Sequence, residues 1–322
     1  MKLGVIGEPC IDYIHRGSTA KNKQLGGILY SIVSLAVISG KDDEVYPVMN
    51  LGGDEFDFVT AFLSKFGNIK HDFINKCGYK TRIVNLYYNN PPQDTLNSES
   101  DAKKTYDREE SSTAPALPVE YNFISKALPL LDGLLINMVS GIDISAETLK
   151  EIRKNFSGNI HMDLHNVVMN THEDGNRIQG PVKDWEVWCS NCDTLQMNES
   201  EIAIMHAEKM NEYETAEKIL SHIGVKSLVI TRGKFGVTLY QRVGKTSAGE
   251  QYFELDKIDL PAIERNNFKD STGCGDVFAS SFFYKNMVHK LSDFHSSLNY
   301  ANKMASLNSV LNGVEELNLL NK

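Results

Sequence analysis

The chain has 322 residues, and its 42 acidic residues outnumber its 33 basic ones, which gives a formal net charge of −9. Hydrophobic residues make up 41% and charged residues 23%, a composition typical of a globular chain that buries a large core. Because the balance is acidic and the sequence has no basic stripe, nucleic acid and anionic membrane surfaces are disfavoured as main partners.

The apolar runs and the cysteines indicate the cellular environment. The most apolar stretch, Ile28–Ile38, contains polar residues and falls short of the ~20 residues that cross a bilayer. The N-terminus resembles a strand that enters a turn rather than a signal peptide. Five scattered cysteines are too few for a disulfide framework, and Cys189 and Cys192 form a single C-x-x-C that we interpret as a structural loop, not a zinc site. We therefore expect a reduced, cytoplasmic protein.

Short apolar runs alternate with amphipathic stretches along most of the chain. The apolar runs are too short for helices and apolar on both faces, which predicts parallel strands covered on both sides. In chain order we expect strand Leu3–Ile6, helix Ile28–Ile38, strand Val45–Met49, helix Asp54–Phe66 with Asp54 as N-cap, helix Glu120–Leu131, strand Gly133–Met138, helix Ala146–Phe156, strands Asn159–Asp163 and Thr194–Met197, helix Asn211–Ile223, strand Leu228–Thr231, and helices Asp276–His289 and Asp293–Leu311. This alternation predicts a doubly wound α/β sheet.

Three segments depart from this alternation. Ile11–Gln24 is polar and extended, and Thr81–Tyr88 alternates in the manner of an exposed antiparallel strand. Asn89–Pro118 is rich in Pro, Ser and charged residues and lacks periodicity. A mobile surface insert and a part of an active-site lid are equally open interpretations of this last segment.

A glycine-rich turn near the C-terminus carries the chemistry. Gly273, Cys274 and Gly275 open directly into an amphipathic helix, so consecutive backbone N–H groups and the helix N-terminus form a cradle for a phosphate or a phosphoryl oxyanion. Asp276 follows at the helix start, where it can accept a proton from a hydroxyl while the charge that develops rests on the N–H groups. A tight turn with Asp276 as a helix cap is the alternative.

The longer string Asp-Ser-Thr-Gly-Cys-Gly-Asp, which ends at Asp276, resembles the signature of the ribokinase-like (PfkB) carbohydrate kinase family. Further segments resemble the family's motifs in the family's order. They are Gly7–Asp12 (GEPCID), Gly26-Gly27, Asn50–Asp57 (NLGGDEFD), Asp163–Asn166 (DLHN), Asn198–Glu201 (NESE) and Thr231–Gly236 (TRGKFG). The resemblance implies one ribokinase-like α/β domain over 1–322, with a mostly parallel sheet and a small β lid built from about 11–25 and 79–112.

The resemblance also implies an activity. The chain would transfer the γ-phosphoryl group of ATP to a hydroxyl of a sugar or sugar-like molecule, with Mg²⁺ near the phosphates. A nucleoside or vitamin kinase on the same fold, and a non-catalytic sugar or nucleotide sensor, are the alternatives. Asp276 beside intact glycines favours an enzyme over a sensor.

Site residues follow from the matching motifs. The resemblance assigns Asp276 as the base, Gly273, Cys274 and Gly275 to the anion hole, Asp12, Gly26, Gly27 and Asp54 to the acceptor, Asn198, Thr231, Gly233, Gly236 and Asn302 to the nucleotide, Glu201 to Mg²⁺ through water, and Asp270 to a candidate K⁺ site. For the pair Asn198 and Glu201, an exposed helix cap is the alternative. The resemblance further suggests a homodimer formed through the lid.

Some residues differ from the family pattern or resemble other motifs. Ser31 stands where ribokinase carries Asn, which argues against a ribose-specific site. A cysteine at a helix N-terminus tends toward a lowered pKa, so we expect alkylation of Cys274 to inactivate the protein. Arg82 and Arg108 are expected to be solvated rather than to bind an acidic acceptor. Gly244-Lys245-Thr246 imitates a P-loop but is expected to lie in a hairpin.

Overall fold

A nine-stranded sheet forms the centre of the protein in the computed structural model, which describes residues 1–16, 22–88, 108–171, 177–222, 224–247 and 250–321. Across the sheet the order is β15 (Glu250–Leu260), β14 (Val237–Ser247), β13 (Ser227–Thr231), β12 (Thr194–Asn198), β9 (Asn159–Asp163), β8 (Gly133–Asn137), β1 (Lys2–Ile6), β4 (Glu44–Gly52) and β5 (Ile74–Cys77). All neighbours pair in parallel except β13–β14 and β14–β15. The six predicted strands are confirmed.

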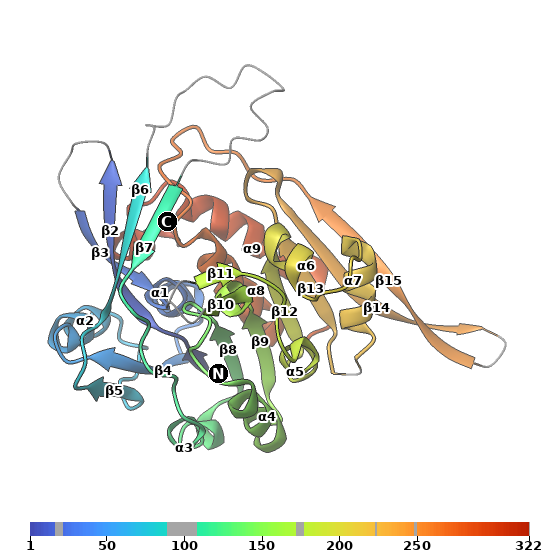
Figure 1. Cartoon of the computed structure of the whole chain (residues 1–322), viewed down its shortest axis with the longest axis horizontal. Coiled ribbons are helices and arrows are strands. Elements are labelled where there is room, and N and C mark those ends of the chain that lie inside the picture. Colours follow the sequence, from blue (N-terminus) through green and yellow to red (C-terminus); the bar gives the residue numbers. More distant parts are fainter. Residues whose placement is uncertain (17–21, 89–107, 172–176, 223, 248–249, 322) are drawn as a thin grey trace.

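Helices cover both faces of the sheet (Figure 1). Successive residues of the central strands enter opposite cores, because strand side chains alternate between faces: Leu135 packs in one core, and Leu134 and Ile136 in the other. The first core is shared with α1 (Leu29–Ile38), α2 (Phe56–Leu63), α8 (Cys274–Val288), α9 (Phe294–Asn308) and the 3₁₀ segment η5 (Val314–Leu319). The second is shared with α3 (Tyr121–Ile124), η2 (Leu128–Leu130), α4 (Ala146–Asn155), α5 (Trp185–Ser190), η3 (His165–Val168), α6 (Glu199–Ile204) and α7 (Glu212–Leu220).

A second, four-stranded sheet stands above α1 and α2 in Figure 1, and we call it the small sheet. Its order is β3 (Asn22–Gly27), β2 (Pro9–Arg16), β6 (Arg82–Tyr88) and β7 (Arg108–Ser112). It contains both predicted lid segments, although β6 pairs with β2 in parallel and only with β7 in the expected antiparallel sense. Residues 89–107 of the insert lie outside the described residues, and its last residues form β7 and the segment 113–119 that returns to the main sheet.

Two predicted helices differ from the structure. The stretch 120–131 is not one helix: α3 ends at Ile124 and η2 begins at Leu128. Pro129 has no N–H to continue an α-helix through this stretch. Helix α2 is shorter than predicted, and Glu55 is its N-cap residue, so the prediction that Asp54 caps it is wrong. The Asp54 side chain instead accepts hydrogen bonds from the backbone N–H and the hydroxyl of Thr81 at the start of the small sheet.

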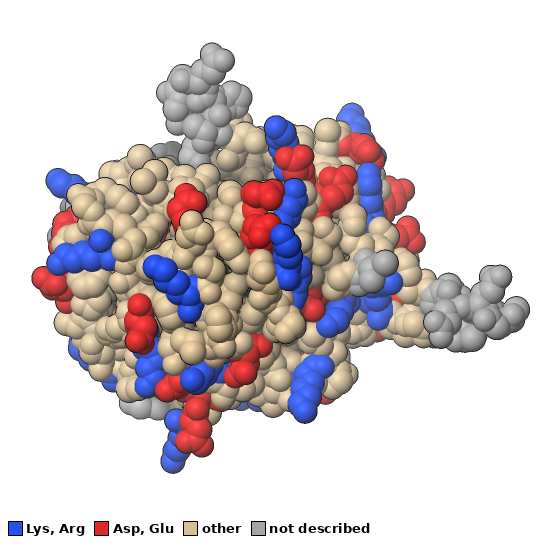
Figure 2. Space-filling view, turned by 90° about the horizontal axis from the view of Figure 1, so that it is seen from below, with Lys and Arg blue, Asp and Glu red and all other residues tan. Residues whose placement is uncertain are grey.

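Gly244 lies within β14, whose antiparallel pairing with β15 is the predicted hairpin. Cys189 and Cys192 are buried free thiols, and within the described part of the chain no cluster of side chains suits direct metal binding. Among the described helices, none has the length and apolar character to span a membrane. Figure 2 shows acidic and basic side chains mixed over the face seen from below.

Candidate active site

The predicted site residues gather at the carboxyl ends of the parallel strands. Asp163 ends β9, Asn198 ends β12 and Thr231 ends β13, and the N-terminus of α8 faces this edge through a hydrogen bond from Gln196 Nε2 to the Gly275 carbonyl. Open α/β sheets bind ligands at this edge because the loops that follow the strands are free to shape a cleft there.

The glycine-rich turn before α8 is built on a conformation that requires glycine. Gly273 has φ +75°, and a Cβ atom there would lie 2.1 Å from the Tyr30 ring on α1. Gly275 has open space on its Cβ side. The turn therefore packs tightly against α1 at its first glycine and remains accessible at its second, as an anion cradle requires.

Asp276 lies in the first turn of α8. Its Oδ1 accepts a 2.8 Å hydrogen bond from Asn137 Nδ2, at the carboxyl end of β8, and Ser31 on α1 also hydrogen-bonds to this carboxyl group. Burial, together with the charge of Asp12, raises the pKa of Asp276 to about 7. A carboxylate with such a pKa is suited to act as a general base near neutral pH, since it combines the ionised form with appreciable basicity.

The predicted acceptor residues lie where the small sheet meets α1. Asp12 on β2 is 5% exposed, and Cys10 Sγ donates a 3.2 Å hydrogen bond to its Oδ1. A Cβ atom at Gly26 would lie 2.2 Å from Asp12 Oδ2, so only glycine leaves room for this carboxylate. Gly27 has φ +60° and turns the chain into α1. The charge of Asp12 adds to the effect of burial on the pKa of Asp276, so the two carboxylates lie near each other.

Asp54 is held differently from Asp12. Its Oδ1 also accepts a 3.1 Å hydrogen bond from the N–H of Glu55, in addition to those from Thr81, so this carboxylate joins the start of α2 to the root of the small sheet. An acceptor contact could use only the other carboxylate oxygen.

Two further carboxyl groups lie close to Asp276. Burial raises the pKa of Asp163 well above its ordinary value, and the charges of Glu201 and Asp276 add to this effect. Burial raises the pKa of Glu201 to about 7. Because these carboxyl groups repel one another, their arrangement fits a divalent cation, held through water and phosphate oxygens rather than by direct protein ligands.

Asn198 and Glu201 form a complete capping box at the start of α6. Asn198 Oδ1 accepts from the N–H groups of Ser200 and Glu201, and Glu201 Oε2 accepts from the Asn198 N–H at 2.7 Å. Glu201 also lies 3.9 Å from His165 Nδ1. The predicted helix cap therefore exists, and it holds the Glu201 carboxylate in the cluster of site carboxyl groups.

The predicted nucleotide residues occupy the turn between β13 and β14 and the neighbouring face of α9. Gly233 (φ +51°) and Gly236 (φ +98°) both need glycine conformations, and a Cβ atom at Gly236 would lie 2.0 Å from the Leu260 carbonyl oxygen. Thr231 Oγ1 donates to the Met197 carbonyl at 3.4 Å. Asn302 Nδ2 donates to the Pro261 carbonyl at 2.9 Å, which fixes the segment after β15 against α9.

Cys274 does not have the predicted reactivity. Its Sγ contacts the Ala305 carbonyl at 3.4 Å and accepts a hydrogen bond from Asn308, and burial raises the pKa of this thiol to about 12. The expectation of a lowered pKa is therefore wrong, because removal from water outweighs the field of the helix terminus. Nearby, Asp270 Oδ1 accepts from the Thr272 N–H at 2.6 Å and so shapes the turn before Gly273.

Arg82 also differs from its prediction, because its side chain is only 4% exposed. Its Nη1 lies 3.5 Å from Glu8 Oε2, and its Nη2 donates to Ser112 Oγ at 3.0 Å. Glu8 Oε1 accepts from the Ala116 N–H at 2.5 Å. The side chain of Arg108 lies outside the described residues.

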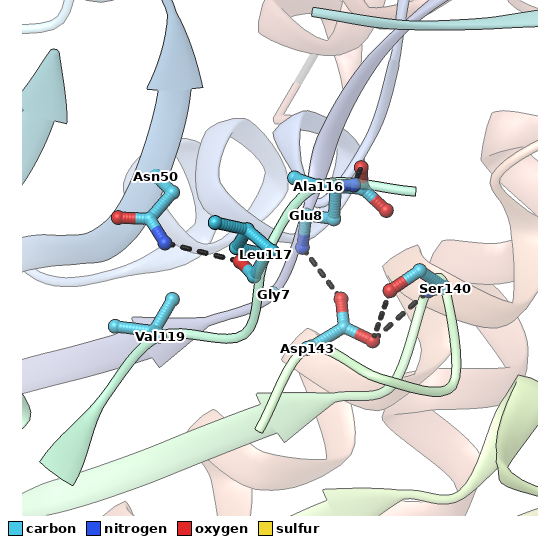
Figure 3. Close-up of a pocket in the computed structure, with 8 residues that line it drawn as sticks. All are labelled: Gly7, Glu8, Asn50, Ala116, Leu117, Val119, Ser140 and Asp143. Atoms are coloured by element: carbon cyan, nitrogen blue, oxygen red, sulfur yellow. Dashed lines mark hydrogen bonds between the residues drawn. The ribbon is translucent and has the colours of Figure 1, made fainter. Parts of the chain in front are cut away.

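Figure 3 shows the small pocket beside Glu8, at the carboxyl ends of β1, β4 and β8. The Glu8 N–H donates to Asp143 Oδ1 at 2.7 Å, and Asn50 Nδ2 donates to the Leu117 carbonyl at 3.1 Å. Burial raises the pKa of Glu8 to about 7, against the opposing effect of Arg82. The pocket lies between the main sheet and the segment 113–119 that returns from the small sheet.

The sequence assigned no site role to Asn137, Asp163, Gln196 and Glu8, which the structure brings into the site, and it gave Ser31 only as a difference from ribokinase and Arg82 only as a solvated side chain. Asn137 and Asp163 carry a usable signal, because each is a polar residue at the carboxyl end of an apolar strand. Glu8 and Arg82 carry no comparable signal, since their pairing joins segments 74 positions apart in the sequence.

Comparison with known structures identifies the fold. A fructokinase from Xylella fastidiosa with bound ATP superposes with a TM-score of 0.71 at 16% identity, over 98% of this chain and 94% of that one. A putative ribokinase II from E. coli in complex with ATP and Mg²⁺ gives 0.67 at 16% identity, over 99% and 97%. A nucleoside kinase from Burkholderia thailandensis in complex with inosine gives 0.70 at 14% identity, over 98% and 94%. The chain therefore has the ribokinase-like fold.

A family model matches the C-terminal part of the chain. Residues 172–314 match the pfkB family carbohydrate kinase model, and this range contains the glycine-rich turn, Asp276 and the nucleotide-turn glycines. Among curated proteins, none matches the chain. Together with the fold, this match confirms the predicted resemblance to the ribokinase-like (PfkB) carbohydrate kinases.

Proposed function

We propose that the protein transfers the γ-phosphoryl group of ATP to a hydroxyl of a sugar or sugar-like molecule. The observation that carries the proposal is the placement of Asp276. It lies at the N-terminus of α8 beside the glycine-rich turn, is held by Asn137, and is near enough to Asp12 for the charge of that carboxylate to raise its pKa. A base next to an anion cradle, with a second carboxylate for hydroxyl groups, is an arrangement suited to phosphoryl transfer.

The residues divide the reaction between them. Asp12 accepts hydrogen bonds from acceptor hydroxyls, and Gly26 leaves it the space to do so. Asp276 takes the proton from the attacking hydroxyl, and Asn137 keeps its carboxylate directed at that hydroxyl. The N–H groups of Gly273, Cys274, Gly275 and Asp276 stabilise the negative charge on the transferred group.

Nucleotide and metal binding use the other end of the cleft. Thr231, Gly233, Gly236 and Asn302 would hold the nucleotide, and the Asn198–Glu201 capping box with Asp163 would hold the waters of Mg²⁺. When bound, Mg²⁺ supplies neutralisation of phosphate charge. The turn held by Asp270 is the candidate K⁺ site.

The small sheet would act as the lid. Its strand β2 carries Asp12, and its root is held to the main sheet through Glu8, Arg82 and Asp54. A sheet attached at its root and carrying an acceptor residue can close over the acceptor and exclude water. We further propose that the protein is cytoplasmic and that it forms a homodimer in which two small sheets pair.

A coupled assay of ADP release tests the function. Mg·ATP is supplied with a panel of sugars, sugar acids, sugar phosphates and nucleosides, and Asp276→Asn is measured beside the unmodified chain. We expect turnover that depends on the acceptor and falls by ~10²- to 10⁴-fold in Asp276→Asn, the range ascribed to general acid–base catalysis. Turnover that survives in Asp276→Asn would show that another group is the base.

A nucleoside acceptor is the second candidate, favoured by the fold similarity to the nucleoside kinase bound to inosine. The same panel separates the two candidates, because a nucleoside kinase would turn over inosine or adenosine and leave free ribose unused. A melting temperature raised by ATP or by a sugar, without turnover of any acceptor, would instead support a sensor.

A further inference from the structure

Arg82 lies on the same face of the small sheet as Asp12. Arg82 lies directly across from Cys10, and Asp12 follows two residues later on the same face of β2. Cys10 Sγ donates a hydrogen bond to Asp12; burial raises the pKa of this thiol, the charges of Asp12 and Glu8 add to the effect, and the charge of Arg82 opposes it. The four side chains therefore surround one corner of the acceptor end of the cleft.

A free guanidinium at this corner would attract an anionic acceptor. Arginine binds carboxylates and phosphates through a rigid fork of N–H donors, and burial strengthens the attraction. Here the fork is occupied, because Nη1 faces the Glu8 carboxylate and Nη2 donates to Ser112. Arg82 Nε is buried and has no partner among the described residues.

Glu8 is itself held in place from three directions. Its side chain accepts from the Ala116 N–H, its N–H donates to Asp143, and its carbonyl accepts from the Ile28 N–H at 3.0 Å, directly after the paired glycines. Glu8 therefore cannot leave Arg82 without disturbing both the return segment and the start of α1. The fold therefore fixes the pairing of the Glu8 carboxylate with the Arg82 guanidinium.

We infer that Glu8 is a specificity-determining residue, which by pairing with Arg82 makes the acceptor site select an uncharged polyhydroxy compound over a sugar acid or a sugar phosphate. This inference rests on the proposed kinase function and adds the charge class of its acceptor. With Arg82 neutralised, Asp12 and Asp276 leave the acceptor end of the site acidic, so an anionic acceptor meets net repulsion.

The test compares matched acceptors that differ in charge: D-ribose with D-ribonate, and D-glucose with D-gluconate. The value of kcat/KM is measured for each at pH 8, where Glu8 is ionised. In Glu8→Gln the Nη1 and Nε donors of Arg82 become free for a carboxylate. We expect the preference for the neutral member to fall at least about tenfold, which corresponds to about 1.4 kcal/mol.

Glu55→Gln is the matched control. It removes the ion pair with Lys23, 2.7 Å long, that joins the small sheet to the N-cap of α2 away from this corner. We expect its preference to equal that of the unmodified chain. The inference would be overturned if Glu8→Gln kept the same preference for the neutral acceptor as the control variant. It would also be overturned if the unmodified chain preferred the acids.

Two arrangements keep the test decisive. If Glu8→Gln does not fold, Arg82→Gln is tested in its place. A preference for the neutral acceptor that persists in Arg82→Gln supports the inference, and loss of that preference overturns it. Melting-temperature shifts with the same compounds and a non-hydrolysable ATP analogue report binding without turnover. A larger shift with the acids overturns only the inference, whereas the absence of any shift contradicts the proposed function as well.

Discussion

At the scale of single residues, the structure separates the polar groups of the site by their surroundings. Asp276 and Asp54 are both aspartates at the carboxyl edge of the main sheet. Asp276 is held by side chains and burial raises its pKa, whereas backbone and side-chain donors lower the pKa of Asp54. The same residue type thus serves as a candidate base in one place and as a structural anchor in the other.

The pKa of Asp276 predicts the pH dependence of the reaction. Since the base must be deprotonated and its pKa is raised to about 7, kcat/KM should be level above that pH and fall about tenfold for each pH unit below it. A pH–rate profile between pH 5 and 9 checks this. A profile still level at pH 5.5 would contradict the assignment of Asp276 as the base.

The contact between Gly26 and Asp12 predicts a selective loss of acceptor binding. In Gly26→Ala the new methyl group would overlap the Asp12 carboxylate, so the carboxylate must move. We expect the KM for the acceptor to rise about tenfold or more, the cost of about 1.4 kcal/mol of lost binding, while the KM for ATP stays within twofold.

Gly67→Ala is the control for that substitution, because a Cβ atom at Gly67 meets no other atom within 4 Å. Steady-state kinetics with each substrate varied in turn measure the effect. An equal rise in both KM values for Gly26→Ala would indicate a general disturbance and not a role for Asp12 at the acceptor.

At the scale of elements, two capping boxes of the same design occur in different surroundings. Asn198 and Glu201 begin α6 at the site, and Asn211 and Glu214 begin α7 away from it. Both fix a helix N-terminus, but only Glu201 is also coupled to Asp163. A residue can therefore be both a helix cap and part of a cation site, and the two interpretations need not compete.

These boxes give a matched pair of substitutions. In Glu201→Gln and Glu214→Gln the glutamine can still complete the box, so at pH 5, where the buried Glu201 carboxyl group is protonated, neither should change the stability by more than about 1 kcal/mol. Only Glu201→Gln should raise the Mg²⁺ concentration needed for half-maximal activity, by about tenfold, because only it removes charge from the carboxyl cluster. Thermal melts and Mg²⁺ titrations measure the two effects, and similar Mg²⁺ curves for both variants would leave Glu201 as a cap alone.

The elements also show what the sequence could predict. The apolar strands and their parallel pairing were predictable because a buried strand needs apolar residues on both faces, and the glycine-rich turn was predictable because its spacing is specific. The break before Pro129 and the start of α2 were not, since local pattern specifies helix ends poorly. The Glu8–Arg82 pair and the surroundings of the Cys274 thiol depend on tertiary contacts that no local pattern contains.

At the scale of the whole molecule, burial of carboxyl groups at the site should lower its stability as the pH rises. The pKa values of Glu8, Glu201 and Asp276 are all raised to about 7 from ordinary values of 4.5, 4.5 and 3.8. The folded protein therefore binds more protons than the unfolded chain between about pH 4.5 and 7, and its stability is lost progressively across that range.

We expect the melting temperature to fall between pH 5 and 8, with each group contributing on the order of 3 kcal/mol to the change in unfolding free energy. Carboxylates with lowered pKa values, such as Asp43 and Glu212, act in the opposite sense and below this range. In Asp276→Asn the fall should be smaller, and at pH 8 this variant should melt at a higher temperature than the unmodified chain. A melting temperature that stays the same between pH 5 and 8 in both proteins would contradict the prediction.

The close packing of Tyr30 on Gly273 has a thermodynamic consequence. The Tyr30 ring belongs to the helix that begins at the paired glycines, yet it forms the wall of the glycine-rich turn. A displacement of α1 would therefore shift the glycine-rich turn as well. Under the proposed function, an acceptor that displaced α1 would change the affinity for ATP, and by linkage ATP would change the affinity for the acceptor by the same factor.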